Sequence, residues 1–174
     1  MTASSRRTKA RISLMQPADG LVYKWGRTRT KRMPLGLAYV AAALEPIAET
    51  LKVVDAALDD LAVEEAVDQA LSVDPHLVAI TCTTPLFHQA VEMVALIKDF
   101  SPRTAVVIGG PHVSALPAAS LKDSRADFIC VGEGEVSAAE IVKCVMEGTD
   151  PAAIPGIVYD WNGYQGETAA YRRG

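Results

Sequence analysis

The sequence predicts an α/β fold in which a five-stranded parallel sheet has helices on both faces. The main observation is that three apolar runs each end in small or polar residues. Buried strands with such ends are typical of the carboxyl edge of a doubly wound sheet, where these sheets bind ligands. The runs and their turns are 77–80 with 81–84, 104–108 with 109–110, and 126–131 with 132–134.

The composition indicates one globular domain with a full hydrophobic core. The chain has 174 residues, of which 49% are hydrophobic and 22% are charged. The net charge of −4 argues against a nucleic-acid-binding surface, which is normally basic. No apolar run approaches the ~20 residues that cross a bilayer, and no secretory signal begins the chain.

The cysteines indicate neither a metal site nor a disulfide framework. The spacing of Cys82, Cys130 and Cys144 matches no zinc or iron–sulfur motif. We expect each to be a small buried hydrophobic side chain. An odd number of unclustered cysteines fits a reducing compartment, so the sequence predicts a cytoplasmic protein.

Short apolar runs alternate with helical patterns along the chain. Pro34 is expected to start the first helix, Pro46 to end or kink it, and Asp59 or Asp60 to cap the second. A further short strand at 157–161 and a turn at Asn162-Gly163 precede a polar end that we expect to be frayed. The expected strands are 12–15, 51–55, 77–80, 104–108 and 126–131, and the helices are 34–49, 61–70, 90–97, 118–122 and 137–147.

Five such units with short connections predict the flavodoxin-like (Rossmann-like) strand order 2-1-3-4-5. The domain is expected to cover residues 12–150, after a flexible basic tail at 1–11 and before an extension or linker at 151–174. The switch point of this order lies between strands 1 and 3. The loop at 16–33 should therefore lie beside residues 81–84.

That loop is long for a strand-to-helix connection, which usually has ~2–6 residues. Long loops at a ligand edge are often functional, and aromatic side chains such as Tyr23 and Trp25 normally have something to cover. The alternative is a mobile surface insertion.

Glycines and hydroxyl groups are the candidate ligand contacts at this edge. Gly109 and Gly110 allow close approach because they have no Cβ, and residues 81–84 offer hydroxyl groups. Glu133 and Glu135 either contact the ligand or stabilise the start of the last helix through its dipole.

Several other kinds of site are disfavoured. The first strand does not lead into Gly-x-Gly-x-x-Gly, a P-loop is absent, and the acidic pair of a response-regulator receiver is missing. His76, His88 and His112 are scattered, and no nucleophile has an evident base.

The segments 34–39 and 53–56 and the turns 109–112 and 132–135 resemble the cobalamin (vitamin B12)-binding domain of B12-dependent radical SAM proteins. The resemblance runs from about Ile12 to Tyr159. It implies a corrin on the carboxyl edge of the sheet, with the nucleotide tail running along the Gly-Gly turn.

The resemblance also implies which residues contact the cofactor. Those from the segment 16–36, which would lie under the corrin, are Pro17, Tyr23, Trp25, Arg27, Leu35 and Gly36. Those expected at the tail or the corrin amides are Thr81, Cys82, Thr83 and Thr84, with Gly109 and Gly110 making room for the tail. Those expected at the benzimidazole or the corrin rim are Pro111, His112, Gly132, Glu133 and Gly134.

Two departures from related domains shape the functional hypothesis. Methionine-synthase-like B12 domains carry Asp-x-His-x-x-Gly after the first strand, whereas this chain has Leu21 at the His position. The resemblance therefore implies base-off cobalamin whose cobalt has no axial histidine from the protein. The Cys-x-x-x-Cys-x-x-Cys motif that holds the [4Fe–4S] cluster of radical SAM domains is also missing.

The leading hypothesis is a cobalamin-binding module that is not catalytic alone. A radical SAM domain or partner protein would supply methyl transfer or radical chemistry. One alternative is a B12-dependent sensor or carrier that acts through a partner. The other is a flavodoxin-like interaction domain without a ligand.

Overall fold

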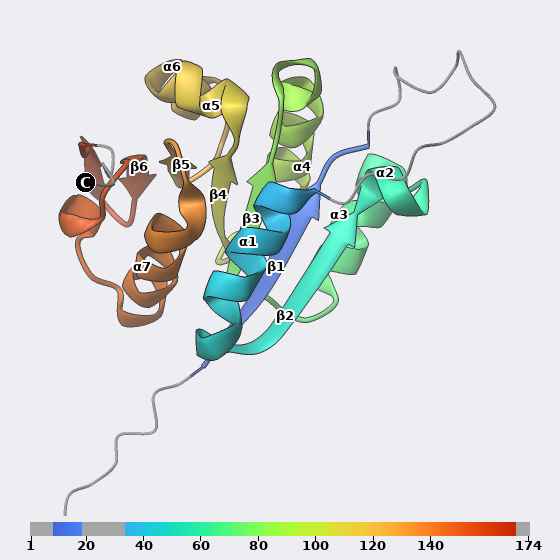
Figure 1. Ribbon diagram of the computed structural model, residues 1–174, viewed down its shortest axis with the longest axis horizontal. Helices are drawn as coiled ribbons and strands as arrows, with labels where there is room; N and C mark the ends of the chain where they lie inside the picture. Colours follow the sequence, from blue (N-terminus) through green and yellow to red (C-terminus); the bar gives the residue numbers. More distant parts are fainter. Residues whose placement is uncertain (1–8, 19–33, 170–174) are drawn as a thin grey trace, which may run out of the picture.

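The computed structural model describes residues 9–18 and 34–169, which form a mixed sheet with helices on both faces (Figure 1). The strand order is β2-β1-β3-β4-β5-β6-β7. The strands are β1 (Ala10–Gln16), β2 (Ala48–Asp55), β3 (Leu77–Thr81), β4 (Ala105–Gly109), β5 (Phe128–Cys130), β6 (Ile157–Trp161) and β7 (Tyr164–Glu167).

The first five strands are parallel and have the predicted order 2-1-3-4-5. The prediction of a purely parallel five-stranded sheet is wrong, because β6 pairs antiparallel with β5 and β7 pairs antiparallel with β6. The extra strand at 157–161 is confirmed. The expected frayed end was wrong for residues 164–167, because Asn162 and Gly163, both at positive φ, reverse the chain into β7. Residues 170–174 of that end lie outside the described part of the chain.

The sheet extends beyond residues 12–150 at both ends. It begins at Ala10, inside the segment expected to be a tail, and its last two strands lie within the segment expected to be an extension. The continuous sheet therefore runs from Ala10 to Glu167.

The helix boundaries differ from the expected ones around Pro46. The helices are α1 (Leu35–Leu44), α2 (Ala56–Asp59), α3 (Val63–Leu71), α4 (Phe87–Phe100), α5 (Pro111–Ala115), α6 (Pro117–Asp123) and α7 (Gly134–Glu147). The first helix ends at Leu44, before the expected residue 49, because Pro46 lies in the 3₁₀ turn η1 (Glu45–Ile47). Strand β2 therefore begins at Ala48, earlier than the expected residue 51.

The expected cap at Asp59 or Asp60 was wrong. The residue that precedes the expected helix, α3, is Ala62. Asp55, which ends β2, caps the short unpredicted helix α2, where it accepts hydrogen bonds from the backbone N–H groups of Ala57 and Leu58. In α3, the Glu65 side chain accepts from the N–H of Ala62, the residue that precedes the helix.

Side chains alternate between two hydrophobic cores on the two faces of the sheet. In β3, Val78 and Ile80 face a core formed with α3 and α4, whereas Leu77 and Ala79 face a core formed with α1 and α7. Figure 1 shows these two helix pairs on opposite sides of the sheet. The carboxyl ends of β1, β3, β4 and β5 thus meet at one edge between the two helix layers.

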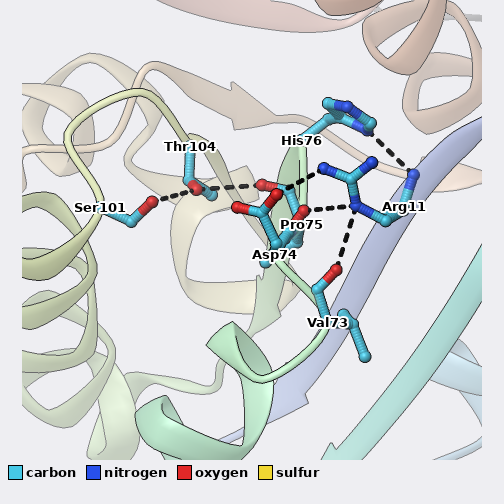
Figure 2. Close-up of polar contacts among 7 residues, drawn as sticks. All are labelled: Arg11, Val73, Asp74, Pro75, His76, Ser101 and Thr104. Carbon is cyan, nitrogen blue, oxygen red and sulfur yellow. Dashed lines mark hydrogen bonds and ion pairs between the residues drawn. The ribbon is translucent and has the colours of Figure 1, made fainter.

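Arg11 ties the start of β1 to the turn before β3 at the amino edge (Figure 2). Its guanidinium donates to the carbonyls of Val73 and Asp74 and pairs with the Asp74 carboxylate at 2.7 Å. Its backbone N–H donates to Nδ1 of His76 at 3.0 Å.

Within residues 9–18 and 34–169, no helix has the length and apolar character needed to cross a membrane.

Candidate functional site

The carboxyl edge brings together most of the residues selected from the sequence. Pro17 follows β1, residues 81–84 end and follow β3, residues 109–112 end and follow β4, and residues 132–134 follow β5. Leu35 and Gly36 begin α1, and Leu35 is 66% exposed. Tyr23, Trp25 and Arg27 lie outside the described residues.

The turn after β4 packs directly on the end of β3. Thr81 lies opposite Gly109 in the parallel register, and the N–H of Cys82 donates to the Gly109 carbonyl at 3.0 Å. A Cβ on Gly110 would lie 2.6 Å from the Cys82 carbonyl oxygen, and the residue has φ +105°. The missing side chain of Gly110 therefore makes room for the protein's own backbone.

Gly109 and Gly134 would each accept a Cβ with ordinary contacts to the described residues. Among the described residues, the only atom within 4 Å of a Cβ on Gly109 is Cβ of Cys130, at 3.9 Å. A Cβ on Gly134 would lie 3.5 Å from Val40 Cγ2 and 3.6 Å from Cys130 Sγ, which are ordinary contacts. Cys130 and Val40 belong to the α1–α7 core, so both glycines border that face.

The same face is slightly open in the middle of the sheet. Ala79, in the central part of β3, keeps 9% exposure, whereas its neighbours Val78 and Ile80 on the other face keep 0% and 1%. Ala79, Gly109, Cys130 and Gly134 form what we call the small-residue strip, which leads from the middle of the sheet to its carboxyl edge beside α1 and α7.

Hydrogen bonds link the turns on the α3–α4 side of the edge. His112 Nδ1 lies 3.2 Å from Thr84 Oγ1, and the His112 and Phe87 rings lie 4.2 Å apart at 32°. The N–H of Gly132 donates to Ser114 Oγ at 2.9 Å. Phe87 and Ser114 were not predicted from the sequence, because only the folded chain places them beside residues of another strand end.

The cysteines of the chain are buried, and two of them, Cys82 and Cys130, lie at this edge. All three are free and buried, which confirms the expectation from the sequence. Burial raises the pKa of Cys82 and of Cys130 to about 11. The Cys82 side chain lies in the core of the α3–α4 face.

Glu133 and Glu135 lie at two different positions relative to the start of α7. Glu133 is the residue before the helix and makes no side-chain cap hydrogen bond, and Glu135 lies in the first turn. Glu135 thus has the position where a helix dipole favours a carboxylate. Among the described residues, no group of three His, Cys, Asp or Glu side chains is placed to hold a metal ion.

Comparisons with known proteins identify relatives of known families. Residues 28–142 match the family model of the B12 binding domain. The chain is 31% identical over 131 residues to an uncharacterized methyltransferase of Pyrococcus horikoshii, covering 75% of this chain and 28% of that protein. It is 29% identical to the anaerobic magnesium-protoporphyrin IX monomethyl ester cyclase of Rubrivivax gelatinosus, covering 72% of this chain and 24% of the cyclase.

Solved structures show the same fold. The cobalamin-dependent S-adenosylmethionine radical enzyme OxsB, with aqua-cobalamin and S-adenosylmethionine bound, has a TM-score of 0.79 at 16% identity, covering 95% of this chain and 23% of OxsB. The radical S-adenosylmethionine methyltransferase TsrM from Kitasatospora setae, with cobalamin and a [4Fe–4S] cluster, has a TM-score of 0.75 at 20% identity, covering 93% of this chain and 29% of TsrM.

The chain thus spans between about a quarter and a third of the length of these relatives. The relatives include a cobalamin-dependent radical SAM methyltransferase, TokK of Streptomyces tokunonensis, at 32% identity over 87 residues, 49% of this chain and 13% of TokK. The resemblance inferred from the sequence is confirmed. The family match, which covers more than half of the chain, shows that this protein belongs to the B12-binding domain family.

Proposed function

We propose that this domain holds base-off cobalamin at the carboxyl edge of the sheet, with the nucleotide tail along the small-residue strip. The observation that carries this placement is the room at Gly109, where among the described residues a Cβ would have only Cys130 Cβ within 4 Å, at 3.9 Å. A flat or bulky ligand approaches a backbone closely only where no side chain intervenes.

The residues around this space fit a corrinoid. Gly109, Gly134 and Ala79 provide an apolar path for the tail beside α1 and α7. Thr83 and Thr84 are exposed at the end of β3, where their hydroxyl groups can pair with the amide groups on the corrin periphery. Leu35, exposed at the start of α1, offers apolar contact at the rim.

We propose that this chain supplies no histidine to cobalt. His76 lies at the amino edge, hydrogen-bonded to Arg11, and His88 is exposed on α4. The remaining histidine, His112, is paired with Thr84. The histidine position of the related loop motif is Leu21, which lies outside the described residues.

A radical SAM domain, in the same polypeptide or in a partner, is proposed to complete the active enzyme. Bound cobalamin supplies methyl-transfer or radical chemistry at cobalt. The residues of this chain bind and orient the corrinoid and shield its tail from water. The proposal is supported by the relatives TokK and OxsB, which are named as cobalamin-dependent radical SAM enzymes and are several times longer than this chain.

An absorption titration of the purified chain with hydroxocobalamin and methylcobalamin, followed by gel filtration, tests binding. We expect corrinoid to co-elute with the protein and to show a base-off spectrum. A failure of both cobalamins to bind contradicts the proposed function.

The placement of the tail is tested by Gly109→Val. The new methyl groups enter the space of the small-residue strip, so cobalamin affinity should fall at least about tenfold, or ~1.4 kcal/mol. Cobinamide, which lacks the nucleotide tail, should lose less than about threefold. The matched control is Ala119→Val on the exposed side of α6. Equal losses for both corrinoids would place the tail elsewhere.

A further inference from the structure

We propose that His112 is a corrin-rim contact that binds a peripheral amide of the corrin, and is neither a cobalt ligand nor a tail contact. This inference rests on the proposed function and divides the binding edge into two parts. The small-residue strip lies on the α1–α7 face, and the His112 cluster, formed by Thr84, Phe87 and His112, lies on the α3–α4 face.

The position of the cluster follows from its neighbours in the chain. Val113, next to His112, is fully buried in the α3–α4 core, and Phe87 packs against the same core. Gly109 borders Cys130, in the opposite core. Strand β4 therefore separates His112 from the path proposed for the tail.

The cluster holds the imidazole in one orientation. Thr84 occupies Nδ1 at 3.2 Å, and the Phe87 ring, at 4.2 Å, limits rotation of the imidazole plane. Phe87 begins α4, so the ring contact joins that helix to the turn after β4. Among the described residues, Nε2 has no protein partner, and the half-buried side chain leaves it available to a ligand.

A primary amide suits this nitrogen in either tautomer. If Thr84 donates to Nδ1, then Nε2 carries the proton and donates to an amide carbonyl. If Nδ1 donates to Thr84, then Nε2 accepts from an amide N–H. The corrin periphery carries acetamide and propionamide groups, which offer both. A phosphodiester in the tail only accepts and would fit one tautomer.

The test compares cobalamin and cobinamide binding to the full chain and to His112 variants. His112→Ala should weaken both corrinoids by a similar factor of about tenfold, because both carry the corrin amides. His112→Gln places an amide near the position of Nε2 and should recover part of the affinity. His112→Asn places its amide near Nδ1 and should not. The matched control is His88→Ala, and thermal unfolding confirms that each variant folds.

Three results of these measurements would contradict the role proposed for His112. A loss of cobalamin binding with unchanged cobinamide binding would make His112 a tail contact, and unchanged binding of both would remove it from the site. A change in the absorption spectrum of bound hydroxocobalamin in His112→Ala would indicate an axial ligand. Any of these three results overturns the inference. Failure of the unmodified chain to bind either corrinoid instead overturns the proposed function.

Discussion

Two adjacent glycines, Gly109 and Gly110, differ in whether the fold requires a glycine at that position. The turn needs Gly110 because its φ is +105° and because the Cys82 carbonyl fills the place of a Cβ. Gly109 meets neither condition, since its Cβ would make one ordinary contact with Cys130. The fold therefore requires glycine at position 110, whereas it would accept a side chain at position 109.

Gly110→Ala and Gly109→Ala should separate these two roles. Gly110→Ala combines a backbone region that is essentially restricted to glycine with a contact of 2.6 Å, so we expect a loss of about 3 kcal/mol or more in the free energy of unfolding. Gly109→Ala should be neutral or stabilise the strand by up to ~1 kcal/mol. Urea unfolding measures both, and equal effects would contradict the distinction.

At the level of elements, the Arg11–His76 contact joins the starts of two parallel strands. The Arg11 N–H donates to His76 Nδ1, and the His76 N–H donates back to the Arg11 carbonyl at 2.8 Å. Nδ1 accepts only when it is unprotonated. Burial and the Arg11 guanidinium lower the pKa of His76 from its ordinary value of 6.5.

This contact predicts a loss of stability in mild acid. Because the pKa is lower in the folded chain, the unfolded chain binds the proton more readily. The stabilisation is complete above pH 6.5 and is lost as the pH falls through the lower folded pKa. Urea unfolding between pH 5 and 8 should show this loss in the parent chain and in His88→Ala. It should be reduced in His76→Ala, and identical curves for all three would contradict the prediction.

The boundary between β2 and α2 depends on one aspartate that belongs to both elements. Asp55 ends a strand and caps the next helix, so a carboxylate at a strand end serves the element that follows. Asp60, expected to cap, instead has φ +58° at the end of α2. Sequence spacing suggested an acidic cap before the second helix but did not show that Asp55, at the end of β2, reaches the free N–H groups of α2.

For the whole molecule, the β6–β7 hairpin covers the β5 edge of the parallel sheet. β5 has three residues, and β6 buries Ile157, Val158 and Tyr159 beside it. The Trp161 ring lies 5.7 Å from Phe128. Thr168 closes the hairpin, since its Oγ1 accepts from Ile157 N–H and donates to the Ile154 carbonyl.

Truncation after Asp150 should therefore abolish cooperative folding. Burial of each of the three β6 side chains contributes ~1.5–3 kcal/mol, and the sum is comparable to the ~5–15 kcal/mol stability of a typical domain. Truncation after Ala169 keeps all seven strands and serves as the control. Thermal unfolding by circular dichroism gives the comparison, and a cooperative transition in the shorter chain would contradict the prediction.

The sequence alone was sufficient for the order of the parallel strands and for the turns of small and polar residues at their carboxyl ends. Both depend on local signals, namely apolar runs long enough for a buried strand and turns that only small or polar residues form. The family resemblance depended on the same turns, and for that reason the cofactor could be inferred before the fold was known.

The tertiary structure decided what local signals do not contain. Whether a polar end such as Tyr164–Glu167 becomes a strand depends on a free edge of the sheet that lies elsewhere in the chain. The different roles of Gly109 and Gly110, and the pairing of His112 with Thr84, likewise arise between residues of different strands. The physical reason is that local sequence sets backbone preferences, whereas the space around a side chain and its hydrogen-bond partners are set only when distant strands pack together.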